Sequence, residues 1–186
     1  RSDYKNLIGR CRVSDPNCTP GSEFNGGEVE IAGLEVFLLH TLPLTDFSRL
    51  EWALSYTYTE SEFGQTFLSG FSQWGLVREG DELPYIPEHI GNARISYFRN
   101  KWGIEGALDF QSEMREVPGT GDIGEELHAD DFTTLDLTIS HQTTDAFTLQ
   151  VMLLNALDKA AIVSHRPFGA RPNRPRSLVA RIKYRF

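Results

Sequence analysis

The sequence contains no run of apolar residues long enough to form a membrane helix. No window approaches the roughly 18 consecutive apolar residues that such a helix needs, and the mean hydropathy is −0.33. A transmembrane β-barrel stays possible, because its strands alternate lipid-facing and lumen-facing residues and its average hydropathy is unremarkable. The chain begins at Arg1, without an initiator Met or a recognisable secretory signal. We therefore expect a processed or partial chain.

Cysteine is also scarce. The two cysteines, Cys11 and Cys18, lie in the short stretch "RCRVSDPNCTPG". In an exported protein, a short loop closed by a disulfide is the natural interpretation, and two free thiols are the alternative. A metal site is disfavoured, because neither a second cysteine pair nor a nearby histidine accompanies them.

The sequence has no recognisable catalytic constellation. The five histidines are scattered, and none lies at a metal-ligand spacing from another: His40, His89, His128, His141 and His165. The stretch "GTGDIG" lacks the Lys-Ser/Thr of a phosphate loop, and no nucleophile–base pair is visible. We expect no enzymatic activity, cofactor or metal centre. Nucleic acid is not an expected partner either, since the formal net charge is −8.

What the sequence does have is period-two alternation. In "RLEWALSYTYTE", Trp52, Leu54 and Tyr56 alternate with small or charged residues. No segment sustains a helical period. The pattern predicts eight strands, near residues 3–10, 27–43, 47–62, 89–100, 102–115, 131–143, 146–156 and 177–186.

The connections between these strands alternate in length. Residues 43–46, 99–101 and 142–145 are tight turns, whereas 11–26, 63–88, 116–130 and 157–176 are long and rich in Gly, Pro and charge. Short turns at one end and long loops at the other are typical of outer-membrane barrels, whose short turns are periplasmic and whose long loops are extracellular.

The two faces of the predicted strands differ in chemistry. One face is aromatic and aliphatic. The other is polar, and we expect it to line a wet lumen, because a dry core could not hold so many charges without a heavy desolvation cost. The predicted lumen-lining residues are Glu35, Arg49, Glu51, Arg94, Glu105, Asp109, Asp136, Arg181, Lys183 and Arg185. A soluble β-sandwich, with its core on the aromatic face, is the competing interpretation.

Five stretches, in order, resemble the C-terminal part of TonB-dependent outer-membrane receptors for ferric siderophores, and the overall likeness is to ferric-citrate-type receptors. They are "NGGEVEIAGLEV" (25–36), "LSYTYTESEF" (54–63), "LPYIPEHIGNARISY" (83–97), "LLNALDKA" (153–160) and "PNRPRSLVARIKYRF" (172–186). In the fourth stretch, Ala156 and Leu157 stand where the family usually has Leu and Phe.

The resemblance implies an all-β fold: an antiparallel transmembrane β-barrel of about 22 strands, of which about eight are present. Residues 1–186 would be the C-terminal barrel segment, with the plug domain and the N-terminal strands absent. A complete eight-stranded outer-membrane barrel with a structural or adhesive role is the other membrane alternative.

The resemblance also implies function, partners and sites. The receptor would lie in the bacterial outer membrane, in contact with lipid and lipopolysaccharide, and would import a ferric chelate energised through TonB, which would bind the missing N-terminal part. In the basic loop 157–176, the candidate ligand contacts are His165, Arg166, Arg171 and Arg174. The alternative, which we favour, is that these arginines pair with lipopolysaccharide phosphates or with acids of neighbouring loops. The terminal aromatics Tyr184 and Phe186 resemble the signal by which the barrel assembly machinery recognises its substrates.

Overall fold

The computed structural model describes every residue except 12, 14–18, 72, 125–127, 167–168 and 186. The described residues form strands, turns and irregular segments. Among them there is no helix that is both long and apolar enough to cross a membrane.

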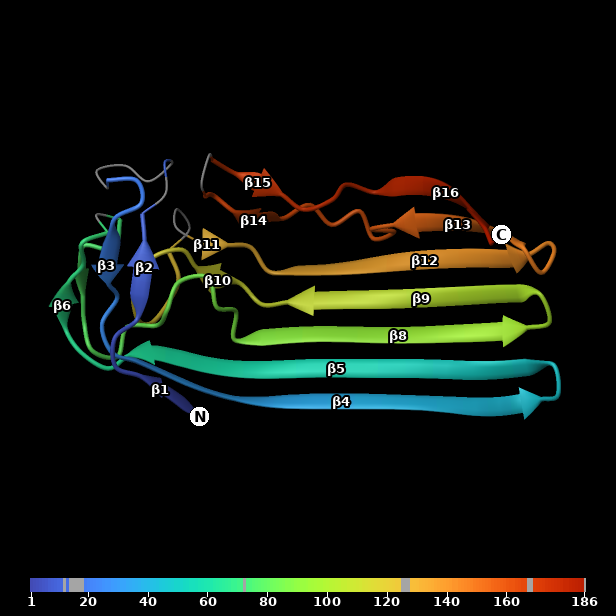
Figure 1. The fold of residues 1–186 in the computed structure, drawn as a ribbon, viewed down its shortest axis with the longest axis horizontal. Coiled ribbons are helices and arrows are strands. Elements are labelled where there is room, and N and C mark those ends of the chain that lie inside the picture. Colours follow the sequence, from blue (N-terminus) through green and yellow to red (C-terminus); the bar gives the residue numbers. More distant parts are fainter. Residues whose placement is uncertain (12, 14–18, 72, 125–127, 167–168, 186) are drawn as a thin grey trace.

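Eight strands form one continuous antiparallel sheet (Figure 1). In spatial order they are β1 (Ser2–Tyr4), β4 (Val29–Thr45), β5 (Ser48–Phe63), β8 (His89–Arg99), β9 (Trp102–Gln111), β12 (Phe132–Gln142), β13 (Phe147–Leu154) and β16 (Ser177–Tyr184). Each strand pairs with its neighbour in sequence among these eight, which is an up-and-down meander. The predicted all-β antiparallel fold is confirmed.

Alternation fixes the register of the sheet. Leu54 is opposite Ala93, Ala93 is opposite Leu108, and Leu108 is opposite Leu135. A slip of one residue would turn every side chain of a strand to the other face. The pairing therefore collects most of the apolar residues on one side, called the apolar face below, and most of the charged residues on the other, called the polar face.

Tight turns join the strands at one end of the sheet, called the turn end. Asn100 adopts a φ of 51° there, in the left-handed region that asparagine tolerates. Its backbone N–H donates to the carbonyl of Phe47, at 2.9 Å, in the neighbouring turn. The turns thus support one another across β5 and β8.

The prediction of a single strand at residues 3–10 is wrong. β1 pairs with β4 for only three residues, and the chain then leaves the sheet. Residues Ile8–Arg10 form β2, which pairs with β3 (Glu23–Asn25) in a separate hairpin. The backbone of Cys11 extends that hairpin by bonding Ser22 and Gly21. Local pairing with β3 supplies the backbone hydrogen bonds that a longer β1 would have taken from β4.

The sheet is open among the described residues, since β1 and β16 lie on opposite edges. A complete eight-stranded barrel would pair these two strands, so that alternative is wrong for this structure. A sandwich would divide the eight strands between two packed sheets. All eight instead lie in one sheet, and the soluble sandwich is wrong as well.

The opposite end carries the long loops, which fold into a structured layer. This loop layer comprises the described residues within 5–28, 64–88, 112–131 and 155–176. It contains four strand pairs in all, the β2–β3 hairpin and three more: β6 (Phe67–Leu68) with β7 (Leu76–Val77), β10 (Met114–Arg115) with β11 (His128–Ala129), and β14 (Ile162–Ser164) with β15 (Arg171–Pro172).

The buried hydrophobic cluster also lies at this end. Val29 and Phe63, at the loop ends of β4 and β5, pack with Val77 and Leu83 of the loop layer. The rings of Phe63 and Trp74 meet edge to face at 5.5 Å. Among the described residues, the sheet has no comparable buried cluster. The loop layer is therefore held by its own apolar packing, worth roughly 1.5–3 kcal/mol for each fully buried large side chain.

The apolar face of the sheet is exposed instead. Its exposed large side chains include Leu34, Leu38, Trp52, Leu54, Ile95, Trp102, Ile104, Leu108, Ile139, Val151, Leu178 and Ile182. A contiguous apolar patch of this extent marks a surface that another apolar phase or molecule covers.

Candidate functional site

The predicted lumen-lining residues fall on one face. Register places nine of them together: Glu35, Arg49, Glu51, Arg94, Glu105, Asp109, Asp136, Arg181 and Lys183. Arg185 follows β16, and its backbone N–H donates to Ala146 at 2.8 Å. The common face is a structural finding, and its role as a lumen wall stays a prediction.

Some charges on this face pair with one another. Arg49 Nε lies 2.6 Å from Glu51 Oε1, and the Arg49 guanidinium lies over the ring of Phe98 at 4.2 Å. Glu105 accepts a hydrogen bond from Ser96 at 3.0 Å and lies 3.9 Å from Arg94. These contacts hold the long side chains along the sheet.

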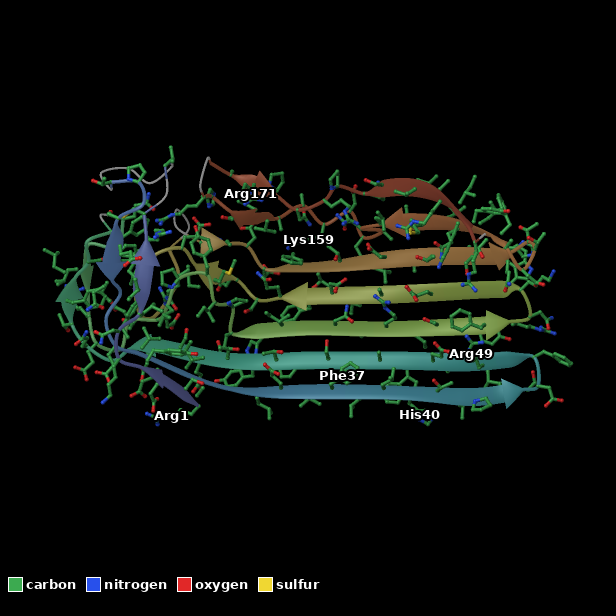
Figure 2. All side chains as sticks on the ribbon, viewed as in Figure 1. Arg1, Phe37, His40, Arg49, Lys159 and Arg171 are labelled. Atoms are coloured by element: carbon green, nitrogen blue, oxygen red, sulfur yellow. The ribbon has the colours of Figure 1, made fainter. Side chains whose placement is uncertain are left out.

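The polar face also carries apolar residues that the predicted set omitted. Phe37 and Leu39 of β4 share it with Glu35, and both are about two-thirds exposed, at 68% and 67%. Figure 2 shows Phe37 on β4 and Arg49 on the adjacent β5. The signal was visible in the sequence as broken alternation in "GLEVFLLHTL".

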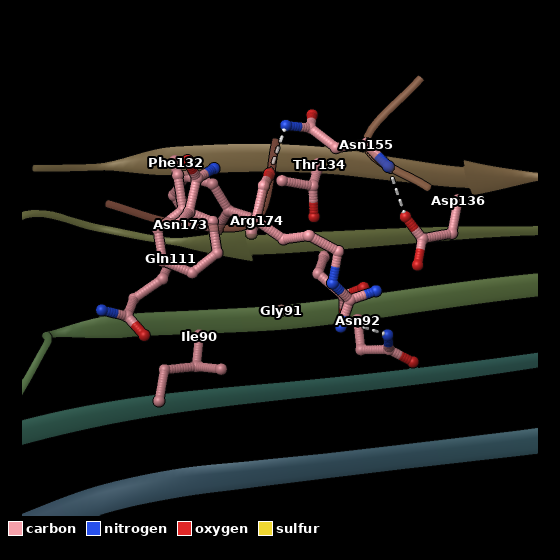
Figure 3. Close-up of a pocket in the computed structure, with 12 residues that line it drawn as sticks. Ile90, Gly91, Asn92, Gln111, Phe132, Thr134, Asp136, Asn155, Asn173 and Arg174 are labelled. Atoms are coloured by element: carbon pink, nitrogen blue, oxygen red, sulfur yellow. Dashed lines mark hydrogen bonds between the residues drawn. The ribbon is translucent and has the colours of Figure 1, made fainter. Parts of the chain in front are cut away.

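A recess of about 400 Å³ opens on the polar face, where β8, β9 and β12 approach the loop layer (Figure 3). Its lining includes the carboxylates of Asp109 and Asp136 and the side chain of Arg174. The side chain of Asn92 donates to Asp109 at 2.6 Å. Arg174 forms no side-chain ion pair or hydrogen bond among the described residues. The recess therefore presents one uncommitted cation beside two acids.

Asn155 fixes the loop that carries Arg174. It is 3% exposed and has a φ of 48°. Its side-chain amide donates to the carbonyls of Lys159 and Arg174, each at 2.9 Å, and its Oδ1 accepts from the Lys159 N–H. Its own N–H donates to Asp136 at 2.8 Å. Asn155 thus ties both ends of the 157–176 loop to β12.

The four predicted ligand contacts are not gathered at the recess. Arg174 lines it, whereas Arg171 is exposed on β15. The Arg166 guanidinium lies over the ring of Phe71 at 5.5 Å. His165 is held by Glu116, since its backbone N–H donates to Oε1 at 2.7 Å. The structure therefore separates these side chains into different environments.

The pairing of Glu116 belongs to a polar cluster buried between loops. Glu116 is 2% exposed, and its Oε2 lies 3.3 Å from Nδ1 of His165. The Tyr85 hydroxyl is buried nearby without a hydrogen bond of normal geometry. Burial raises the pKa of the Tyr85 phenol, the neighbouring Ser164 hydroxyl opposes that rise, and the Glu116 charge adds to it.

A half-buried ion pair in the loop layer was not predicted from the sequence. Arg115, whose side chain is 9% exposed, donates to Glu82 at 2.6 Å and also to the carbonyl of Gly121. This pair, like that of Glu116 with His165, joins residues far apart in sequence. No local periodicity signals such a contact.

Two predictions fall partly outside the described residues. Cys11 is buried, at 3% exposed, but Cys18 lies outside them, so the Cys11–Cys18 disulfide stays a prediction. Phe186 lies outside them too. Tyr184 is 60% exposed on the apolar face, with its ring 6.3 Å from that of Phe147. The insertion-signal role of Tyr184 and Phe186 is likewise untested.

Known proteins share this architecture. Residues 1–156 match the family model described as "TonB dependent receptor-like, beta-barrel". The iron-regulated outer membrane virulence protein of Vibrio cholerae is 26% identical over 181 residues, covering 90% of this chain and 25% of that protein. A second strain of the same species has a counterpart with the same identity and coverage. The chain spans about a quarter of the length of these curated relatives.

Two solved structures share the fold. The siderophore receptor PiuA from Acinetobacter baumannii superposes with a TM-score of 0.68 at 16% identity, covering 98% of this chain and 24% of that one. The ferric-catecholate import receptor Fiu from E. coli gives a TM-score of 0.67 at 16% identity, with 99% and 24% covered.

These matches explain the exposed apolar face, which in such barrels faces lipid. The chain lies in the bacterial outer membrane, and it belongs to the TonB-dependent receptor-like β-barrel family.

Proposed function

We propose that this chain supplies barrel wall, external loops and closing strand to a receptor that imports a ferric chelate with energy delivered through TonB. The proposal rests on a sheet with one apolar face and one charged face. A recess on the charged face is lined by Arg174, whose guanidinium has no ion pair or hydrogen bond among the described residues. Ferric citrate and ferric catecholates are anionic, and a guanidinium binds such groups through charge-assisted hydrogen bonds.

The orientation follows from the connections. Short turns of outer-membrane barrels are periplasmic and long loops extracellular, so the loop layer faces the medium. The recess then lies just below the external loops, on the lumen side. A chelate captured by the loops would meet Arg174 before it travelled further along the polar face.

The carboxylates of Asp109 and Asp136 shape the selectivity of this position. Asp109 is bonded by Asn92, and Asp136 accepts the Asn155 N–H. Both carboxylates therefore have hydrogen-bond donors within the chain, whereas the Arg174 guanidinium forms no side-chain hydrogen bond or ion pair among the described residues. An anion at this position would contact the Arg174 guanidinium, because the side-chain amide of Asn92 already donates to Asp109 and to the carbonyl of Leu108.

The test is uptake of radiolabelled iron, as ferric citrate and as ferric siderophores, by iron-limited cells that carry the whole receptor. Arg174→Gln should raise the KM of the transported chelate about tenfold, the effect of one lost charge-assisted contact. Arg176→Gln is the matched control, because Arg176 is already paired with Asp158 at 3.0 Å.

Deletion of TonB should abolish uptake in the unmodified strain. Uptake that continues at the same rate without TonB would refute the energised mechanism. Equal KM values for Arg174→Gln and Arg176→Gln would refute the proposal that Arg174 contacts the chelate.

A further inference from the structure

A groove of about 300 Å³ lies on the apolar face at the turn end, away from the recess. It is lined by Tyr97, Arg99, Asn100, Trp102 and Ile104. Tyr97 is opposite Ile104, and Arg99 is opposite Trp102, in the pairing of β8 with β9. The groove is therefore apolar toward the middle of the sheet and cationic toward the turn.

Its depth in the membrane follows from the length of β8. The 11 residues of this strand extend over roughly 33 Å at about 3.3 Å per step. At a tilt of about 40° the strand spans roughly 25 Å, which matches the height of the apolar band of a barrel. His89 stacks with Tyr58 at one end of the strand, at 5.3 Å. Arg99 ends the strand at the other, periplasmic boundary.

Aromatic rings also mark that boundary. The ring of Trp102 lies 4.3 Å from that of His141 on β12. Trp102 is 55% exposed, and its indole N–H forms no hydrogen bond among the described residues. Interfacial aromatics of this kind lie at the level of lipid headgroups.

The charge of Arg99 is not used within the described part of the chain. Arg99 is exposed and forms no ion pair or side-chain hydrogen bond there. The neighbouring Lys101 donates instead to the carbonyl of Thr143, at 3.4 Å. A guanidinium at the edge of the apolar band is placed to pair with a phosphate, the anion that its planar donors match best.

We infer that this groove binds one glycerophospholipid of the periplasmic leaflet. An acyl chain lies along Tyr97 and Ile104, and the headgroup phosphate contacts the Arg99 guanidinium, with the Trp102 indole N–H as a further donor. The inference depends on the outer-membrane location and the orientation of the sheet. It does not depend on which chelate is imported.

The test is native mass spectrometry of the whole receptor, extracted from outer membranes in mild detergent. Arg99→Ala should carry one phospholipid fewer than the unmodified protein, and Arg99→Lys should keep a larger share than Arg99→Ala. Arg94→Ala is the matched control, because Arg94 lies on the same strand but on the polar face, 3.9 Å from Glu105. All variants are first checked for a heat-modifiable band shift, which reports an assembled barrel.

Should Arg99→Ala fail to assemble, Arg99→Gln removes the same charge while keeping part of the stem. Adding phosphatidylethanolamine or phosphatidylglycerol to delipidated receptor should restore the adduct, and inorganic phosphate should not. The inference is overturned if the charge-removing variant retains as many phospholipids as the unmodified protein. It is equally overturned if Arg94→Ala loses as many.

Discussion

The Oε2 of Glu116 lies 3.3 Å from Nδ1 of His165, although 49 residues separate the two in the chain. Glu116 is almost fully buried, and its other oxygen accepts the backbone N–H of His165. One carboxylate thereby fastens the 157–176 loop to the segment that follows β10.

Glu116→Ala should loosen the 157–176 loop. The change leaves the His165 N–H without an acceptor in a partly buried place, which costs up to about 1–3 kcal/mol. Limited proteolysis should cut the loop faster, and the His165 amide should exchange with solvent faster. Glu116→Gln keeps an acceptor and should have the smaller effect. Glu113→Ala, at an exposed position of the same segment, serves as control, and equal cleavage of all three variants would contradict the prediction.

Asn155→Asp should disorder the same loop by breaking the contacts that hold its two ends. The substitution replaces the NH2 group that supplies both N–H donors by one carboxylate oxygen, which then faces the carbonyls of Lys159 and Arg174. Loss of two buried hydrogen bonds, with repulsion added, should cost about 2–4 kcal/mol. Hydrogen exchange across 157–176 measures the effect. Asn100→Asp is the control, because Asn100 also has a positive φ but lies exposed in a turn; matching exchange rates in both variants would argue against an anchoring role.

Much of the sheet could be predicted from the sequence, whereas the loop layer could not. Period-two alternation is a local signal, so Leu54 and Arg94 could be assigned to opposite faces without knowing their partners. Ile8 alternates in the same way, yet it pairs with Asn25 outside the sheet. Alternation shows that a segment is extended and says nothing about which strand it meets.

The candidate site, like the fold, could be predicted only in part from the sequence. Arg174 could be placed in a basic loop from composition alone. Its position at the recess depends on Asn155, whose contacts reach residues 4 and 19 positions away. The burial of Glu116 depends on His165, which lies 49 positions further along the chain. Contacts of that kind follow from tertiary packing, which no local pattern encodes.

Phe63→Ala should weaken the loop layer while the sheet keeps its register. The Phe63 side chain is fully buried, at 0% exposed, among the residues that hold the layer together. Truncation of a buried Phe costs about 3–5 kcal/mol through lost burial and the cavity left behind. Leu68→Ala, at 78% exposed on the adjacent β6, should cost less than about 0.5 kcal/mol. Protease cleavage of loop 63–88 in intact cells compares the two variants, and similar cleavage would refute the assigned core.

Tyr85→Phe should make the loop layer more tolerant of alkaline pH. Burial raises the pKa of the Tyr85 phenol above its usual value near 10. The folded state then holds the phenolic proton more tightly than the unfolded state, so this contribution to stability is full below pH 10 and is lost as pH rises through the folded-state pKa. Hydrogen exchange of the loop layer should therefore accelerate above about pH 10 in the unmodified protein and accelerate less in Tyr85→Phe. Tyr4→Phe is the control, since Tyr4 is 49% exposed, and identical alkaline profiles for Tyr85→Phe and the unmodified protein would contradict the prediction.

A charge introduced on the apolar face should be far more costly than the same charge one residue further along β5. Leu54 lies on the apolar face near the middle of β5, and Ser55 lies on the polar face opposite Asn92. An arginine on the lipid side of a barrel costs about 2–4 kcal/mol at the bilayer midplane, whereas a lumen position tolerates it. Leu54→Arg should therefore reduce the amount of heat-modifiable receptor in outer membranes, and Ser55→Arg should leave it close to normal. Because both variants introduce arginine at adjacent positions of β5, the two proteins should differ little in expression, strand propensity or distance of the charge from the turns. The reverse order of the two variants would mean that the faces have been assigned the wrong way round, and the recess with Arg174 would then face lipid instead of the lumen.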